Sequence, residues 1–511
     1  MYETSNKPFP FWGAKTTSKT GRDPLAVQNS SVVIYDNMVK GITNMTVRIR
    51  HNGFYCWLMT FIAERLIAFN PSKVDNLNEQ IKYIRRGELL LAFTMQYNFP
   101  QVNGNIGSIY AQNNINAQIL DLALGADLEN KPKVYWQHRL GGFGQYYLGV
   151  LTQLSLIFLP DNNHNTYRVT ENKGYKLCEI FRQSLTKEQE DLFWEAINSG
   201  KIEKEKLLEL KNLALHLIDN EAELQEYEMI FSKPERVDFT GKGITHRIET
   251  IKLLLKYIQG EGANVDRRKL VLSFLKSNFL YVLNCNLEAT DEQLSWFLYE
   301  MNELSHAAYE AHHFALLYST TEEPLPLDSV LNRLKKEYKE YSNTDIDNYS
   351  IYELYEKLQL CYKEKNYGAL VYIGSRLLYA LYDATNKHIN KLLEYAKDEY
   401  DVNHPGFAPS LLLRIIDENK KCDWSFSEEC IYSAINDHLR SSYSKSSIGQ
   451  GIVHNYMVDD GLIWQLRRPD PIRTTPRLPN VIQYIEDIKW IERVGECYGI
   501  TKRGIEILNQ Q

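Results

Sequence analysis

"TDEQLSWFLYEMNELSHAAYEAHHFALLYSTTEEP", residues Thr290 to Pro324, is the stretch that decides the fold class. Thr290 and Gln293 stand at the spacing of a capping box, in which the two side chains satisfy backbone N–H groups of the first helical turn. No glycine or proline interrupts the segment before Pro324. The pattern therefore predicts a single helix of about 28 residues, some 42 Å long at about 1.5 Å per residue.

Similar signals surround this helix on both sides. Thr186 and Gln189 repeat the capping box, and Gly200 follows as a C-terminal stop. Apolar residues at helical spacing predict further helices over residues 54–69, 78–97, 243–260, 266–283 and 352–384. The chain has only 27 Gly and 16 Pro among 511 residues, which leaves room for long helices. We therefore predict a mainly α-helical, multidomain protein.

Composition narrows the class of protein. The charged fraction is 24% and the hydrophobic fraction 44%, as in ordinary globular proteins. The net charge of −7 argues against a general basic coat, so any contact with DNA must be local. Seven scattered cysteines without a C-x-x-C pair indicate reduced thiols and a cytoplasmic protein. The most apolar run, residues 54–69, contains Glu64 and Arg65 and predicts a buried helix, so we expect no membrane contact.

A second stretch, "RLGGFGQYYLGVLTQLSLI" from Arg139 to Ile157, has three glycines in four residues before an apolar helical pattern. It fits neither nucleotide fingerprint. Tyr147 stands where the dinucleotide pattern needs its third glycine, and no Lys-Ser or Lys-Thr pair follows as in a P-loop. We therefore interpret the stretch as a flexible entry to a helix, and we expect no cofactor.

A hairpin is predicted directly after this helix. Asp161, Asn162 and Asn163 are turn formers between two apolar stretches, and Thr170 is a plausible N-cap for the helix that follows. The end of the chain repeats the pattern, since "YRVTENKG" (167–174) matches "YGITKRG" (498–504). Both segments are similar to the wing-to-helix junctions of winged-helix proteins, a likeness that covers about 45 residues at each place and implies two winged helix-turn-helix-like units.

The domain organisation follows from these patterns. We expect an aromatic-rich helical domain over 1–125, a winged-helix-like unit over 126–185, helical domains over 186–345 and 346–445, and a second winged-helix-like unit over 446–511.

In winged-helix proteins the helix before the wing usually enters the major groove, and the wing touches phosphates or the minor groove. The resemblance thus implies a set of nucleic-acid contacts in the first unit. They are Gln145, Tyr146 and Gln153 on the helix, with Arg139, Arg168 and Lys173 around it. A glutamine amide can pair with an adenine edge, and basic residues attract phosphates. The alternative is that this unit packs against protein.

The second unit is preceded by "WQLRRPDPIRTTPRLPN", in which four prolines favour an extended chain. This segment holds the arginines Arg467, Arg468, Arg473 and Arg477. Arginines on an extended segment can bind phosphates bidentately, so we include them among the nucleic-acid contacts. The alternative is a surface loop whose arginines pair with the protein's own acids.

The long helix also carries a candidate metal site. Glu303, His306, Glu310 and His313 follow one another at spacings of 3, 4 and 3, on one face. Two Glu-x-x-His units are similar to those of di-iron carboxylate bundles, where each unit comes from a different helix. Here the ends lie about 15 Å apart along one helix, too far for a single ion. We expect no metal, and we interpret the four residues as a partly buried or solvated polar stripe.

The segment "RDPLAVQNSSVVIYDNMVKGITNMTVRIRHNGFYCWLMTFI" (22–62) resembles the opening block of large uncharacterised bacterial proteins encoded among anti-phage defence genes. The resemblance implies a bacterial protein that works beside other subunits. Together with the absence of known catalytic motifs, it leads us to expect a non-catalytic DNA-associated or scaffolding subunit, with other proteins and double-stranded DNA as partners. The alternative is an enzyme, metal-dependent or a nuclease, with dispersed catalytic residues.

Overall fold

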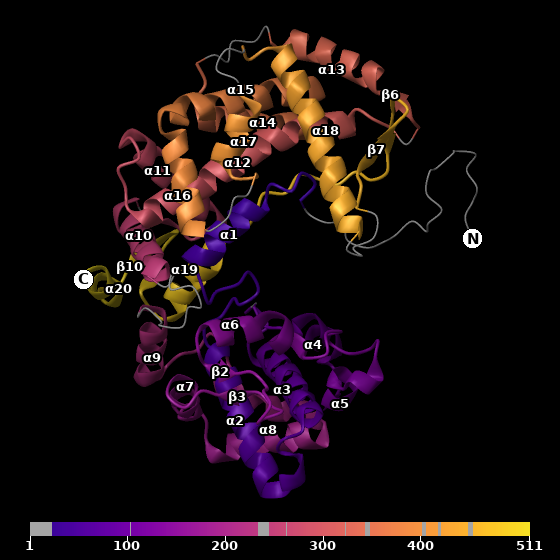
Figure 1. Cartoon of the computed structure of the whole chain (residues 1–511). Coiled ribbons are helices and arrows are strands. Elements are labelled where there is room, and N and C mark those ends of the chain that lie inside the picture. The colour runs from indigo at the N-terminus through magenta and orange to yellow at the C-terminus, as the bar shows by residue number, and fades with distance from the viewer. Residues whose placement is uncertain are drawn as a thin grey trace. The chain divides into compact units, whose positions relative to one another are not determined.

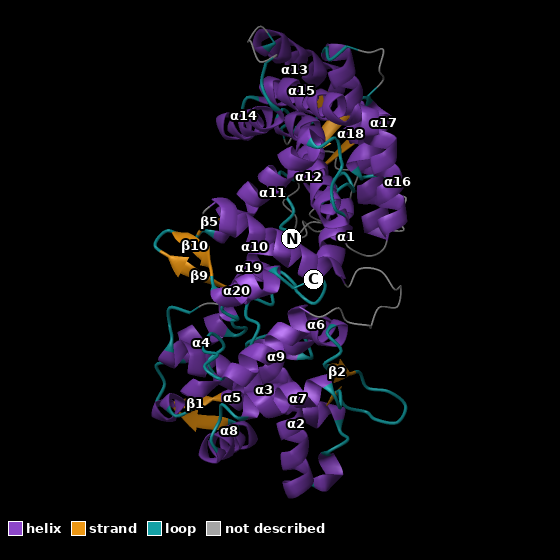
Figure 2. Cartoon of the chain, turned by 90° about the vertical axis from the view of Figure 1, so that its left-hand side faces the viewer, coloured by secondary structure: helices purple, strands orange, loops and turns teal. Residues whose placement is uncertain are grey.

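Helices dominate the computed structural model, which describes residues 23–102, 104–232, 245–261, 263–321, 323–342, 348–400, 405–416, 421–447 and 453–510 (Figures 1 and 2). The prediction of a mainly α protein is confirmed. Contacts divide the chain into two compact units, each assembled from separated segments. The first unit holds Met1–Asp36 and Leu275–Thr475, and the second holds Asn37–Phe274 and Pro476–Gln511. The five expected domains are finer than this division, and the expected boundary at 446 lies within the first unit.

The first unit is a helical assembly with one small sheet. Its helices are α11 (Arg267–Asn284, shared with the second unit), α12 (Asp291–Tyr318), α13 (Leu327–Tyr341), α14 (Ile351–Glu364), α15 (Tyr367–Thr385), η6 (Asn386–His388), α16 (Ile389–Tyr400), α17 (Ala408–Ile415) and α18 (Trp424–Ser447). Helix α1 (Asn29–Met38) begins here and ends in the second unit. The strands β6 (Leu325–Pro326), β8 (Leu462–Gln465) and β7 (Tyr456–Asp459) form an antiparallel sheet in that order.

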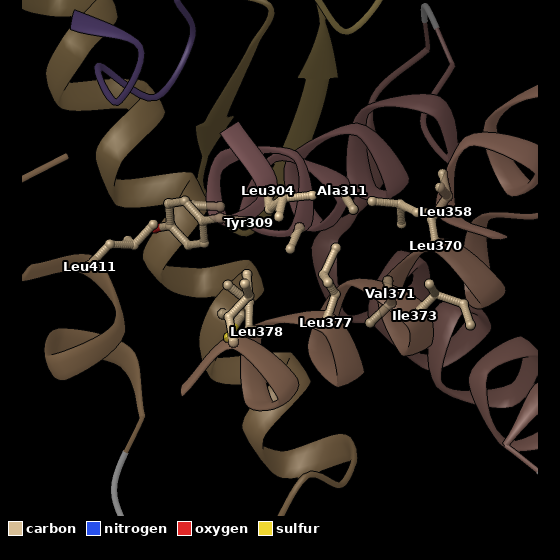
Figure 3. Packing of buried hydrophobic residues seen from close by; sticks show 14 of the residues in the cluster. Leu304, Tyr309, Ala311, Leu358, Leu370, Val371, Ile373, Leu377, Leu378 and Leu411 are labelled. Carbon is tan, nitrogen blue, oxygen red and sulfur yellow. The ribbon is translucent and has the colours of Figure 1, made fainter. Parts of the chain in front are cut away.

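Helix α12 is the centre of the first unit. It has the predicted 28 residues, and both bonds of the capping box between Thr290 and Gln293 are present. From Ser295 onward nearly every side chain is buried, because α15, α17 and α18 pack around it. Figure 3 shows side chains of α12, α14, α15 and α17 gathered in one core. A helix buried on all sides has no solvent-facing stripe, so its polar residues must find partners inside the protein.

The second unit begins with a helical core. Its elements before the chain leaves for the first unit are α2 (His51–Phe69), η1 (Pro71–Lys73), α3 (Leu77–Asn98), α4 (Ser108–Asn114), β1 (Ile119–Asp121), α5 (Leu122–Ala126), η2 (Leu128–Asn130), η3 (Phe143–Tyr147), α6 (Leu148–Gln153), β2 (Ile157–Phe158), β3 (Arg168–Val169), α7 (Lys173–Arg182), α8 (Lys187–Ser199), β4 (Lys201–Glu203), η4 (Lys204–Leu208), η5 (Lys211–Leu213), α9 (Glu221–Ser232), α10 (Thr245–Glu261) and β5 (Ala263–Asn264).

The chain returns to the second unit with α19 (Leu478–Asp487), β9 (Ile491–Val494), β10 (Cys497–Ile500) and α20 (Lys502–Leu508). Strand β1 pairs with β4, and β2 pairs with β3. The third sheet has the order β5-β10-β9, with all pairs antiparallel. Residues 491–494 form strand β9 and do not continue helix α19. The reason is that Lys489 takes a left-handed backbone conformation, with φ +60°, and ends the helix.

Helices α2 and α3 confirm two of the predicted helices and supply the core of this unit. Trp57 of α2 packs against Phe181 and Phe193 with ring centroids 5.7 and 4.9 Å apart.

Within the described ranges, no helix combines the length and apolar character needed to cross a membrane.

Two segments of the second unit share one local structure: a helix, a two-stranded hairpin and a second helix. The first segment is α6, β2, β3 and α7, and the second is α19, β9, β10 and α20. In each, a residue with positive φ ends the first helix, Ser155 at +55° and Lys489 at +60°. The next residue, Leu156 or Trp490, is fully buried and accepts from the threonine that closes the hairpin.

The threonine and glycine of the two matching sequences explain this likeness. The Thr170 hydroxyl donates to Ser155 O and accepts from Gly174 N–H, and Thr501 does the same with Lys489 and Gly504. A Cβ on Gly174 would lie 2.0 Å from Leu156 O, so this helix start needs glycine. The expected helix–hairpin–helix order is therefore present twice. That these are winged helices remains a prediction.

Candidate nucleic-acid interface

The glycine stretch wraps around a carboxylate of the protein itself. Glu88 of α3 is buried, and its oxygens accept from the backbone N–H groups of Gly142 and Phe143 and from the hydroxyls of Tyr55 and Tyr135. Burial raises the pKa of Glu88, and the tyrosine hydrogen bonds oppose this. Backbone N–H groups at the start of a helix form an anion site. Here that site is occupied by Glu88, so the stretch is not a phosphate loop.

Arg85, one turn before Glu88, holds the segment that precedes the glycines. Its guanidinium is buried and donates to three backbone carbonyls, Ala126 O (2.6 Å), His138 O (2.7 Å) and Trp136 O (2.9 Å). It also lies over the Tyr135 ring, 5.1 Å from the centroid. Two buried charged residues on one helix thus fix the backbone of residues 126–143 by five hydrogen bonds.

Above these anchors lies an exposed surface that we call the 131–146 surface. It consists of Lys131, Lys133, Trp136, His138, Arg139, Gln145 and Tyr146, all exposed or half-buried. Residues 131–160 contain no Asp or Glu, so every charged side chain of this stretch is basic. A basic surface with aromatic side chains is the usual composition of a nucleic-acid interface.

Three of the predicted contacts meet on this surface. The Trp136 indole donates to Gln145 Oε1 (2.7 Å), and its ring lies edge-on to Tyr146 with centroids 5.6 Å apart. Arg139 donates one bond to Asn78 (2.8 Å) and is exposed. Gln137 closes the segment on itself by donating to Pro132 O (2.9 Å).

The other predicted contacts of this unit lie apart from the surface or are bound within the protein. Gln153 accepts from the backbone N–H of Gly41 (3.1 Å). Arg168 pairs with Asp161 (3.2 Å) and lies over the Phe158 ring, on the hairpin. Lys173 is the first residue of α7. The structure therefore brings together Arg139, Gln145 and Tyr146, while Arg168 lies on the neighbouring hairpin.

The arginine-rich segment is extended, as predicted, and lies along α12. Residues 466–475, which we call the strap, run antiparallel to the helix: Tyr318 donates to Pro469 O (3.0 Å), and Thr474 N–H donates to Glu303 (3.0 Å). Between these two contacts, the strap runs from the C-terminal end of α12 to the middle of that helix.

Most of the predicted phosphate contacts on this segment are instead engaged by the protein. Arg473 pairs with the buried carboxylates of Glu300 and Glu303. Its guanidinium is therefore already bound by acids of its own chain, and not by phosphate. Arg477 donates to Ile42 O (2.8 Å) in the second unit. Burial lowers the pKa of Arg467. Arg468 is exposed, with bonds to Tyr318 O and the Tyr367 hydroxyl. The prediction fails for Arg473 because α12 has two acids that need a cation.

The polar stripe of α12, which we expected to be partly buried or solvated, is buried because other helices cover it. Each member has a different neighbour. Glu303 accepts from Thr474, His306 contacts Gly406 O (2.7 Å), and Glu310 accepts from Gln28 (3.2 Å). His313 lies against the Tyr456 hydroxyl, and burial lowers its pKa. No three His, Cys, Asp or Glu residues in the described part of the chain are placed to hold a metal ion.

The sequence reasoning missed Arg85 and Glu88, the two anchors, and the basic residues that precede the glycines. One signal was present. Arg85, Arg86 and Glu88 interrupt a run of apolar residues in the middle of a predicted helix, where a charge must be paired if it is buried. The absence of acids from 131 to 160 was a second signal.

Comparison with known proteins adds no family to this description. No protein-family model, no curated protein and no solved structure matches the chain.

Proposed function

We propose that this protein is a non-catalytic DNA-associated subunit whose 131–146 surface contacts the phosphates of double-stranded DNA. The observation that carries the proposal is the coincidence of exposed basic and aromatic side chains with a complete lack of acids over residues 131–160. A basic surface on an acidic protein attracts DNA locally, because phosphate attraction falls off within about 10 Å at moderate salt.

The rigidity of the surface supports the same proposal. A binding site loses less entropy on binding when its backbone is already fixed. Arg85 and Glu88 fix the backbone under Trp136, His138 and Gly142 from below. Burying two charged groups is costly unless each is fully hydrogen-bonded. Arg85 and Glu88 therefore hold the exposed segment in one backbone conformation before any ligand binds, as a preorganised contact surface requires.

The test is the binding of a labelled DNA duplex by fluorescence anisotropy, as salt is raised from about 50 mM. We expect binding that weakens steeply with salt, because released counterions drive phosphate contacts. In the variant Lys131→Glu/Lys133→Glu/Arg139→Glu, the slope of log K against log salt should fall by about 2–3. No binding at about 50 mM salt contradicts the proposal.

A matched control separates this surface from net charge. Lys211, Lys256 and Lys502 are also exposed in the second unit and lie outside residues 131–146. The variant Lys211→Glu/Lys256→Glu/Lys502→Glu changes the net charge by the same amount. We expect it to keep the salt slope of the wild type. An equal loss in both variants would mean that DNA binding is unspecific in location.

A protein-scaffold function has one observation in its favour. Phe158 and Leu159, on the first hairpin, are 46% and 48% exposed. Adjacent exposed apolar side chains on a two-stranded hairpin suit contact with another protein. If this is their function, the variant Phe158→Ser/Leu159→Ser leaves DNA binding unchanged and abolishes co-purification with a partner subunit.

A further inference from the structure

A cavity of about 500 Å³ lies in the first unit, at the C-terminal end of α12. The ends of α12 and α14, helix α13 and the start of α15 surround it. The lining residues are Tyr318, Ser319, Thr320, Thr321, Arg333, Glu337, Glu364, Lys365, Asn366 and Tyr367. The volume falls in the range of small-molecule sites, roughly 300–1,000 Å³.

The lining carries two cations, Arg333 and Lys365, and two carboxylates, Glu337 and Glu364. Arg333 and Lys365 are exposed cations, and no ion pair engages either within the described residues. Glu337 is held at one side of the cavity, since it accepts from Gly368 N–H (3.1 Å), and Glu364 is exposed. Asn366 caps α15, a helix of 19 residues, so the positive end of that helix dipole also faces this region.

Lys365 occupies a position that does not suit lysine. It ends α14 in the left-handed conformation, with φ +58°, where glycine is the usual residue because a Cβ is unfavourable there. A lysine in this place lowers the stability of the helix end. Its position places an ammonium group in the cavity wall.

A buried hydroxyl marks the same cavity independently. Ser319 is 4% exposed, and its hydroxyl has no hydrogen-bond partner in the described part of the chain. Buried polar groups are nearly always hydrogen-bonded, and Ser319 is one of several buried side chains among the described residues whose polar atom has no partner. Arg333 donates to Ser319 O and so holds the cationic and hydroxyl groups side by side.

Two tyrosines complete the lining. Tyr318 and Tyr367 lie with ring centroids 5.7 Å apart, and the exposed guanidinium of Arg468 lies 5.0 Å from the centre of the Tyr318 ring. Arg468 therefore adds a third cation beside the cavity. Aromatic side chains next to cations suit a ligand that has a planar ring and a negative group.

We propose that this cavity binds a small phosphate monoester with a planar aromatic body, of the mononucleotide class. Arg333 and Lys365 bind the phosphate, and Tyr318 and Tyr367 contact the ring. The site lies within the first unit and is independent of the DNA surface proposed above.

The experiment is isothermal titration of the full-length protein with AMP, GMP, CMP and UMP, and with inorganic phosphate and adenosine as part-ligands. We expect at least one nucleotide to bind ten-fold or more tightly than phosphate and adenosine. No nucleotide binding at millimolar concentration overturns the proposal. Equal affinity for phosphate and for the nucleotides overturns the contribution of the tyrosines and hence the ligand class.

The variant Lys365→Gly separates binding from folding. Glycine suits the left-handed position, so the thermal midpoint of this variant should equal or exceed that of the wild type. We expect its nucleotide affinity to fall ten-fold or more. The control is Lys363→Ala, which removes an exposed lysine of the same helix that does not line the cavity. Unchanged affinity in Lys365→Gly, or equal losses in both variants, contradicts the proposal.

Discussion

The two helix–hairpin–helix segments of the second unit have the same junctions but different surfaces. In both, a threonine closes the hairpin and a glycine stands in the first turn of the second helix. In the first segment, α6 and β2 lie in a stretch without acids, and the hairpin turn carries Asp161, which pairs with Arg168. The second has exposed Glu492 and Glu496 at the turn of its hairpin, and its Arg493 pairs with Glu486. The hydrogen bonds of the threonine define the shared motif, whereas the two copies differ in the charges that they expose.

The two segments also differ in how they are held. The first hairpin has two residues in each strand, whereas the second has four in each and gains β5 as a third strand. At the end of the first helix, Gln153 and Asp487 take equivalent positions, two residues before the left-handed residue. Each accepts a backbone N–H, from Gly41 and Ile49 respectively. The first copy thus uses a neutral amide where the second uses a carboxylate.

The largest expected effect concerns the anchor that only the first segment has. In Glu88→Ala, four buried donors lose their acceptor, and each unpaired donor costs about 1–3 kcal/mol. We expect the free energy of unfolding to fall by about 4 kcal/mol, measured by chemical denaturation. The exposed Glu129 gives a control, because Glu129→Ala should change stability by less than about 0.5 kcal/mol. Similar small losses in both variants would show that Glu88 does not anchor the segment.

At the equivalent positions Gln153 and Asp487, a pH dependence is expected only of Asp487, because the glutamine amide does not titrate. Burial raises the pKa of Asp487 from 3.8 to about 6, although Arg48 opposes the shift. The folded protein therefore holds this proton more tightly than the unfolded chain, so the stabilisation is present at low pH and is lost as pH rises from about 4 to 6. At about 1.4 kcal/mol per pKa unit the loss is about 3 kcal/mol.

The variant Asp487→Asn measures this contribution. The difference in unfolding free energy between wild type and variant, determined at several pH values, should fall by about 3 kcal/mol between pH 4 and pH 7. In the first segment, Gln153→Ala should shift stability by the same amount at every pH. A constant difference for Asp487→Asn would contradict the assigned pKa.

A smaller loss of stability is expected when the glycine of either junction is replaced, and the loss should be the same in both segments. A Cβ on Gly174 would lie 2.0 Å from Leu156 O, and one on Gly504 would lie 2.3 Å from Trp490 O. We expect Gly174→Ala and Gly504→Ala each to lower the unfolding free energy by about 2 kcal/mol. Gly149→Ala is the control, since its Cβ would meet no atom within 4 Å and should stabilise α6 slightly. A loss at only one glycine would mean that the two junctions are not equivalent.

Local signals predicted the helices well. The capping boxes at Thr186 and Thr290, the αL end at Gly200 and the 28-residue length of α12 are all observed. These features depend on residues three or four apart, which the sequence displays directly. The candidate contacts were less predictable, since Arg473 and Gln153 find partners that lie far away in the chain.

The sequence by itself determined the helical class, the places where helices begin, and the repeated junction with its threonine and glycine, because each depends on short-range hydrogen bonds and backbone sterics. Only the tertiary structure decided that the glycine stretch surrounds Glu88, that the strap lies on α12, and that the stripe of Glu303 and His306 is buried. A charged residue looks the same in sequence whether it meets solvent or a distant partner. Burial and pairing are properties of the packed chain.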